Sequence, residues 1–298
     1  MAYNLKDKMV IAISSRALFD LEKENQIFDE NGLEAYYQYQ LENENNLLHV
    51  GTAYRFVKNF LKINNAFDDK LIEVIILSRN NAATGLRILH SIDRYDLDIQ
   101  RAGWTGGAPI SRYLKAFKVD LFLSAHEEDV QEAINAGIAA GRILPYSVQG
   151  EEGSHEVRIA FDGDAVLFSE ESEKIYQQEG LEAFLAHERA NAKNPMSEGP
   201  FAKLLKVISN IQENFPREQS PIKTALITAR NSTAQERVIR TLNAWDVRID
   251  EAFYLGGVEK TEVVKAFGAD IFFDDQDVHL EGTAKETPSA KVPYKQGS

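Results

Sequence analysis

The distribution of apolar and polar residues along the chain predicts alternating strands and helices. Short apolar runs are typical of strands buried on both faces, whereas apolar residues spaced three and four apart are typical of amphipathic helices. Strands are expected at residues 10–13, 74–77, 120–123, 158–161, 225–228 and 271–273. Helices are expected at residues 32–46, 82–94, 181–192, 200–214 and 233–244. Such alternation predicts an α/β protein with a parallel sheet covered by helices on both faces.

The second half of the chain repeats the first. When the sequence is displaced by 150 positions, residues 78–127 align with residues 228–277 without a gap, and 12 of these 50 positions are identical. The period is far too long for a solenoid. Two pseudo-repeated Rossmann-like lobes are therefore predicted, residues 1–150 and 151–298, with a boundary near residues 144–156. Chance similarity between two α/β units is the alternative.

The two copies differ at the predicted strand ends. The second copy holds Asp162, Asp164, Lys260, Asp274 and Asp275 where the first holds Ser14, Arg16, Ile110, Ser124 and Ala125. A hydroxyl is kept in both copies, at Ser78 and Thr228. This pattern predicts one catalytic lobe, the second, and one lobe that has lost catalysis.

The strand at residues 158–161 runs directly into Asp162, Gly163 and Asp164. Ligands of parallel sheets bind at the carboxyl ends of the strands, and Gly163 lets the backbone approach a ligand closely. Two converging carboxylates suit a hard divalent cation. They also suit phosphoryl transfer, in which one carboxylate attacks phosphorus and the other handles the leaving group's proton. A solvated turn after a strand is the alternative.

Three further segments add groups suited to phosphate chemistry. "TALITAR" ends a strand at Thr228, whose hydroxyl can donate to a phosphate oxygen. "LGGVEK" places Lys260 at the start of a helix, and "ADIFFDDQ" ends a strand at Asp274 and Asp275. Each alone can be explained as a cap, a surface lysine or a turn. Together with Asp162 and Asp164, they place aspartates, a hydroxyl, a lysine and aspartates, in that order, at three strand ends and one helix start.

This order of groups resembles the four-motif signature of the haloacid dehalogenase-like phosphohydrolases. The resemblance is closer still to the cytosolic 5'-nucleotidases of type I, and it covers most of the chain. In the first half it is carried by "SSRALF" at 14–19, "YQLENEN" at 39–45, "YDL" at 95–97, "TGG" at 105–107, "YLKAF" at 113–117 and "GIAA" at 137–140. In the second half it is carried by "FDGDAVLFSEESE" at 161–173, "TAR" at 228–230, "FFDDQ" at 272–276 and "VPY" at 292–294.

The resemblance implies a Mg²⁺-dependent enzyme that hydrolyses nucleoside 5'-monophosphates, most commonly AMP. Asp162 would be the nucleophile that forms an aspartyl-phosphate, and Asp164 would protonate the leaving 5'-oxygen and then activate water. Thr228 and Lys260 would hold the phosphoryl oxygens. The cation would be held by Asp162, the backbone carbonyl of Asp164, and one or both of Asp274 and Asp275.

The resemblance also identifies residues 169–223 as a cap insert that covers the site. His187 and Asn191 in this insert, and Arg230 and Asn231 after Thr228, are predicted to contact the substrate. A solvated helix face and a helix cap are the alternatives.

In the first copy, Ser14, Ser15 and Arg16 follow a strand, and Arg16 suits a phosphate or carboxylate. One hypothesis is that this lobe binds a nucleotide without hydrolysing it, either an effector or the base of the substrate. The alternative is a lobe retained only for packing.

The amino-acid composition limits the class of protein and the partners expected for it. The chain has 298 residues, 44% of them hydrophobic, which suffices for a sizeable core. It has no cysteine, which excludes disulfides, thiolate catalysis and cysteine-ligated metals. A net charge of -13 argues against a nucleic-acid polymer as partner. No apolar run approaches the ~20 residues of a membrane helix and no signal peptide is recognised, so no membrane partner and a cytoplasmic location are expected.

Several functional alternatives stay open. Another haloacid dehalogenase-like phosphatase or a phosphotransferase to a nucleoside would use the same groups. A nucleotide-sensing module with a vestigial active lobe is a non-enzymatic alternative. Base and sugar preference, the effector and a homo-oligomeric state are not fixed by the sequence.

Overall fold

The computed structural model describes residues 3–146, 156–231 and 234–296. The boundary predicted between the two copies lies largely at residues 147–155, outside the described residues. The strands are β1 (Met9–Ile13), β2 (Phe19–Asp20), β3 (His49–Val50), β4 (Ile72–Ser78), β5 (Arg101–Trp104), β6 (Leu121–Ser124), β7 (Ala139–Ile143), β8 (Val157–Phe161), β9 (Ile222–Thr228), β10 (Glu251–Tyr254), β11 (Ile271–Asp274) and β12 (Ser289–Lys291).

Helices connect most of these strands. They are α1 (Ser15–Leu18), α2 (Glu22–Glu42), α3 (Tyr54–Ile63), α4 (Leu86–Arg94), α5 (Ser111–Ala116), α6 (Glu127–Asn135), α7 (Glu171–Ala190), α8 (Ala202–Gln212), α9 (Gln235–Ala244), α10 (Thr261–Phe267) and α11 (Asp277–Glu286). Shorter helical turns are η1 (Asn64–Ala66), η2 (Gly163–Leu167) and η3 (Arg217–Gln219). Within the described residues, no helix is both long and apolar enough to cross a membrane.

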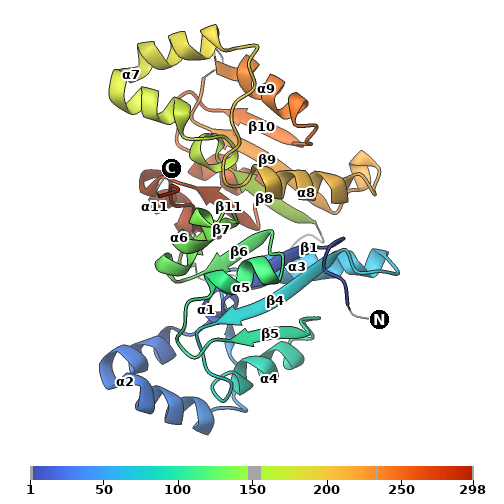
Figure 1. Cartoon of the computed structure of the whole chain (residues 1–298), viewed down its shortest axis with the longest axis vertical. Helices are drawn as coiled ribbons and strands as arrows, with labels where there is room; N and C mark the ends of the chain where they lie inside the picture. The colour runs from blue at the N-terminus through green and yellow to red at the C-terminus, as the bar shows by residue number, and fades with distance from the viewer. Residues whose placement is uncertain (1–2, 147–155, 232–233, 297–298) are drawn as a thin grey trace.

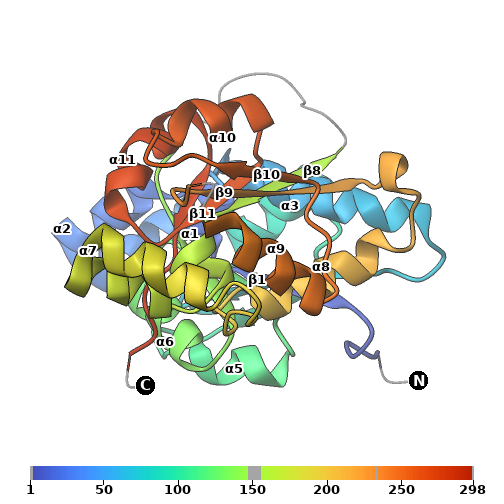
Figure 2. The same cartoon turned by 90° about the horizontal axis from the view of Figure 1, so that it is seen from above.

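Ten strands form one sheet in the order β10-β9-β8-β11-β12-β7-β6-β1-β4-β5. All neighbouring strands are parallel except β7 and β12, which pair antiparallel with Ala290 opposite Ile143 and Lys291 opposite Arg142. Helices cover both faces, with α10 and α11 on one side and α5 and α6 on the other (Figure 2). The prediction of an α/β protein with a parallel sheet and helices on both faces is confirmed, with this one antiparallel pair as an addition.

The two halves of the sheet have the same strand order outward from the β7–β12 pair. In residues 3–146 the order is β7-β6-β1-β4-β5, and in residues 156–296 it is β12-β11-β8-β9-β10. The copies therefore neither form separate sheets nor pack face to face. They extend one sheet edge to edge, and α2 and α7 lie toward opposite ends of the molecule (Figure 1).

All six predicted strands are present, and the predicted helices at 32–46 and 181–192 correspond to the second arms of α2 and α7. Each of these elements contains a glycine with a positive φ, 81° at Gly32 and 83° at Gly180, where two helical arms meet at a kink. The first arms, which begin at Glu22 and Glu171, were not predicted. Glycine adopts the backbone conformation of such a kink at little cost.

An aromatic cluster holds the ends of β8 and β11 in place. Phe161 and Phe273 stack with ring centroids 5.7 Å apart, and Phe201, just before α8, lies 4.7 Å from Phe273 and 6.1 Å from Phe161. All three rings are fully buried. Phe161 and Phe273 immediately precede Asp162 and Asp274 in the chain. The packing of the two rings therefore fixes the backbone from which these two carboxylate side chains extend.

Candidate active site at the carboxyl ends of β8, β9 and β11

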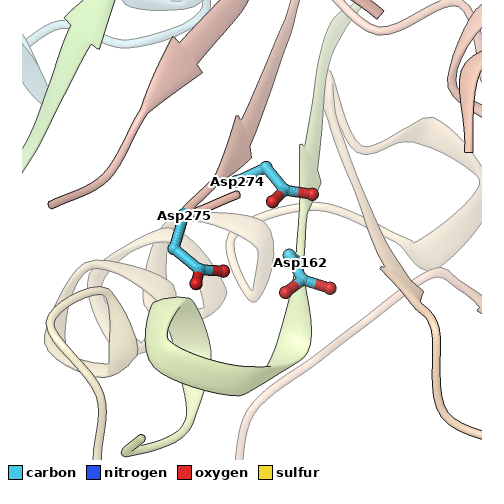
Figure 3. A group of neighbouring side chains, drawn as sticks. All are labelled: Asp162, Asp274 and Asp275. Carbon is cyan, nitrogen blue, oxygen red and sulfur yellow. The ribbon is translucent and has the colours of Figure 1, made fainter. Parts of the chain in front are cut away.

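Three carboxylates meet where β8 and β11 end. Asp162, Asp274 and Asp275 each offer an oxygen, and these oxygens lie within 4.8 Å of one another (Figure 3). The backbone N–H of Asp162 donates to the carbonyl oxygen of Phe273 at 2.8 Å, which ties the two strand ends together. The structure brings together three of the four carboxyls that the sequence placed at the strand ends, whereas the fourth, Asp164, is not part of this group.

Lys260 lies among the carboxylates. It immediately precedes α10, and its Nζ donates to Asp162 Oδ1 and to Asp274 Oδ2, both at 2.7 Å. Its side chain is only 1% exposed. Burial alone would lower the pKa of Lys260, but the charges of Asp162 and Asp274 outweigh burial and raise it, so the ammonium stays protonated.

The three carboxylates differ in protonation. Burial, with the nearby charge of Asp274, raises the pKa of Asp162 to about 6 despite Lys260. Burial, with the charges of Asp162 and Asp274, raises the pKa of Asp275 to about 8. Burial would also raise the pKa of Asp274, yet Lys260 and His279 bring it below its ordinary value. One ammonium is thus too little positive charge to keep all three carboxyls ionised.

The chemistry of this cluster fits a divalent cation. Oxygen ligands from carboxylates are those that Mg²⁺ takes in proteins. Asp275 Oδ2 accepts a hydrogen bond of 2.5 Å from the Tyr294 hydroxyl, whereas Asp275 Oδ1 is buried and has no hydrogen-bond partner among the described residues. An unsatisfied buried carboxylate oxygen, beside two further carboxylates, is a ligand that a cation would use.

Asp164 follows Asp162 in η2 but faces a different partner. Arg230 donates to Asp164 through Nε at 2.8 Å and through Nη2 at 2.6 Å. Between the two aspartates, a Cβ added at Gly163 would lie 3.3 Å from Thr228 Oγ1. Glycine therefore permits the close approach of η2 to the end of β9, which brings Thr228 beside the loop.

Arg230 links η2 to the kinked helix α7. Its Nη1 donates to Glu188 Oε2 at 2.5 Å, and Glu188 also accepts from Arg237 at 2.9 Å. We call Asp164, Arg230, Glu188 and Arg237 the Arg230 network. Burial would raise the pKa of Glu188, but Arg230 and its other donors lower it, so the carboxylate is ionised. The network ties the loop of Asp164 to α7.

The remaining predicted substrate contacts lie at varied places. His187 Nε2 lies 3.1 Å from Arg237 Nη1, and Asn191 Nδ2 donates to the His187 carbonyl oxygen at 3.0 Å, so both border the Arg230 network. Among the described residues, no hydrogen bond joins either side chain to the three-carboxylate cluster. Asn231 lies beside Gly256, where an added Cβ would be 3.5 Å from the Asn231 Cβ.

Ser14, Ser15 and Arg16 lie in the other half of the sheet. They follow β1 and line a separate cavity together with Ser78 at the end of β4. None of the three clustered carboxylates lines this cavity. The structure therefore does not bring these residues to the acidic cluster.

Sequence reasoning missed several residues that support the site. Glu188 lies next to His187, but its partners Arg230 and Arg237 are distant in the sequence. Tyr294 and His279 contact Asp275 and Asp274. Tyr294 belongs to "VPY", one of the segments of the resemblance, which was the available signal.

The fold and site define an α/β protein that gathers carboxylates, a lysine and a threonine at the carboxyl ends of parallel strands, an arrangement suited to a cation and a phosphate. A family model described as 5'-nucleotidase matches residues 1–298, and the chain belongs to this 5'-nucleotidase family.

A curated relative, human cytosolic 5'-nucleotidase 1B, is 37% identical over 291 residues, covering 94% of this chain and 48% of the relative. The chain thus spans about half the length of the curated relative it matches. A solved structure, histidinol dehydrogenase from Elizabethkingia anophelis, matches at 12% identity and a TM-score of 0.23, covering 95% of this chain and 52% of that chain. At this TM-score, the match carries no argument.

Proposed function

We propose that the chain is a Mg²⁺-dependent 5'-nucleotidase that releases phosphate from nucleoside 5'-monophosphates, with AMP as the expected substrate. The observation that carries the proposal is the convergence of Asp162, Asp274 and Asp275 around Lys260. Membership of the 5'-nucleotidase family supports the substrate class. The name of the relative, a cytosolic 5'-nucleotidase, supports the predicted cytoplasmic location.

Asp162 is the proposed nucleophile. One of its oxygens attacks phosphorus, the bond from phosphorus to the 5'-oxygen breaks, and Asp164 gives a proton to that oxygen. Asp164 then takes a proton from water, whose oxygen attacks phosphorus and releases phosphate and free Asp162. The two hydrogen bonds between Arg230 and Asp164 must break before Asp164 can donate a proton to the leaving 5'-oxygen.

Charge compensation makes the attack feasible. A carboxylate and a phosphate dianion repel each other, and Lys260 supplies one positive charge beside Asp162. A bound Mg²⁺, held by Asp162, the carbonyl of Asp164, and Asp274 or Asp275 or both, would supply two more charges. Thr228, near η2, would donate to a phosphoryl oxygen.

The proposed organisation is two copies of one Rossmann-like lobe, residues 1–150 and 151–298, with only the second catalytic. The shared strand order and the matching kinks at Gly32 and Gly180 support it. Within the insert at residues 169–223, α7 is the proposed cover of the site. Its Glu188 joins the Arg230 network, and its Glu173 accepts from Gln276 at 3.4 Å.

The nucleotidase proposal is tested by phosphate release. The wild-type chain is assayed with AMP, IMP, dCMP and glucose 6-phosphate, each with Mg²⁺ and with EDTA. We expect release from the nucleotides and not from the sugar phosphate, and loss of release in EDTA. Release from glucose 6-phosphate at the AMP rate would contradict the substrate class.

The nucleophile is tested by Asp162→Asn, which keeps the shape of the side chain. We expect a loss of about 10³-fold or more in kcat, the scale seen when a catalytic nucleophile is removed. The matched control is Asp277→Asn, which removes an exposed carboxylate at the start of α11, just after β11. A circular-dichroism melt of both variants shows whether each is folded. Wild-type turnover by a folded Asp162→Asn variant would end the assignment.

A further inference from the structure

The half of the molecule without the acidic cluster contains a cavity at the matching place. Its volume is about 670 Å³, within the range of small-molecule sites. Ser14 follows β1, Ser78 ends β4 and His126 follows β6, and all three line it. Since the two half-sheets have the same strand order, this cavity occupies in its half the place that the acidic cluster occupies in the other.

Residues that line this cavity carry hydrogen-bond donors without acceptors. Arg16 Nε and Asn80 Nδ2 are buried and have no hydrogen-bond partner among the described residues. The Ser15 and Ser78 hydroxyls lie 3.0 Å apart and share one hydrogen bond, so one hydroxyl hydrogen remains to be donated. Unmet buried donors are costly unless an acceptor arrives. An anion with several oxygens would satisfy them together.

The charges that line the cavity differ from those of the acidic cluster. Its two carboxylates, Glu24 and Asp29, already accept from Arg87 at 2.6 Å and from Asn25 Nδ2 at 2.9 Å. Ser14, Ser124 and Ala125 stand where the other half has Asp162, Asp274 and Asp275, so carboxylate ligands for a cation are missing at these three positions. Arg16 stands where the other half has Asp164. Its Nη2 pairs at 2.9 Å with Glu22, whose side chain is 70% exposed, and its Nη1 donates to Asn25 Oδ1 at 2.8 Å. The exposed pair with Glu22 is weak, so Nε and Nη2 can serve an anionic ligand while Nη1 keeps its bond to Asn25.

Helix α2 supplies an apolar wall to the same cavity. Phe28, Leu33 and Tyr36 line it, and the Phe28 and Tyr36 rings meet edge-on with centroids 6.1 Å apart. Phe28 and Leu33 are 46% and 64% exposed, unusually high for large apolar side chains. A flat aromatic group that packs against them would remove this surface from water.

We propose that this cavity binds a nucleoside phosphate without a metal ion and without hydrolysing it. The phosphate would lie at Ser14, Ser15 and Arg16, and the base against Phe28 and Tyr36. The inference concerns the other half of the chain and does not depend on catalysis at Asp162. The protein would then have two phosphate-binding sites. The site at Asp162 would need a bound cation, whereas the cavity would need Arg16.

Isothermal titration calorimetry with AMP in EDTA tests the proposal, because EDTA removes the cation from the acidic cluster. We expect wild type to bind AMP, and Arg16→Ala to weaken the affinity about tenfold or more, as expected for loss of a charge-assisted bond to phosphate. Arg94→Ala, which removes an exposed arginine that does not line the cavity, should bind as wild type does. Phe28→Ala should weaken binding of AMP more than binding of inorganic phosphate.

The proposal is overturned if the wild-type chain does not bind AMP at millimolar AMP, or if wild type and a folded Arg16→Ala variant bind it with equal affinity. Asp162→Asn identifies the half that binds, because loss of its negative charge would tighten an anion held beside it. Unchanged affinity in that variant supports the cavity, and tighter binding assigns the ligand to the acidic cluster instead. Since no turnover is measured, failure here is distinct from failure of the nucleotidase assay.

Discussion

Asp275→Asn should stabilise the metal-free protein at neutral and alkaline pH. Burial and the neighbouring charges raise the pKa of Asp275 from 3.8 to about 8. A carboxyl with a higher pKa in the folded chain binds more protons when folded, so the free energy of unfolding falls as pH rises between these values. At about 1.4 kcal/mol for each pKa unit, the part of this shift that lies below pH 7 would cost about 4 kcal/mol at pH 7. Because the three carboxyls share protons, we expect a gain of about 2 kcal/mol.

Urea unfolding of wild type and Asp275→Asn measures this gain. In EDTA, the variant should be more stable at about pH 8, and the advantage should shrink toward about pH 5, where wild-type Asp275 is protonated. Adding Mg²⁺ should stabilise wild type more than the variant, since the cation needs the ionised carboxylate. Asp277→Asn, whose carboxylate is 65% exposed, should follow wild type throughout. An Asp275→Asn variant no more stable than wild type at pH 8 in EDTA would refute the reasoning.

Two further substitutions test the Arg230 network and the loop after β8. Arg230→Gln should lower the free energy of unfolding by about 3 kcal/mol, because it leaves buried Asp164 without a cation and Glu188 with Arg237 alone. Arg240→Gln, in an exposed pair, should change thermal stability little, and equal melting temperatures for both variants would contradict the role of the network. Gly199→Ala should cost about 1–3 kcal/mol in urea unfolding, because its Cβ would lie 2.6 Å from the Val166 backbone oxygen, and a neutral result would contradict this close packing.

The parts of the site that follow apolar strands were predictable from the sequence. Asp162 and Asp274 come directly after short apolar runs, and strands of this kind end at one edge of a parallel sheet. Local sequence therefore determined both the strand and the position of the carboxylate. The repeat then indicated which half holds the acidic side chains.

Features that depend on distant partners were not predictable. Strands β7 and β12 have the sequences "AAGRI" and "SAK", which carry little strand preference. They are strands because β7 pairs with β6, β12 pairs with β11, and the two pair with each other. From the sequence alone, Glu188 is one glutamate on a polar helix and is expected to be exposed. Its burial depends on Arg230, which lies 42 residues away in the chain. The kinks at Gly32 and Gly180 depend on backbone angles that a glycine permits but does not demand.

The antiparallel pair of β7 and β12 joins segments that leave the ribosome at very different times. Residues 139–143 emerge early, whereas the partner at residues 289–291 is made about 150 residues later. Until then, one edge of β7 is uncovered in the nascent chain, and an uncovered edge readily pairs with strands of other chains. Protection from aggregation during synthesis thus depends on the last strand of the sheet to be translated.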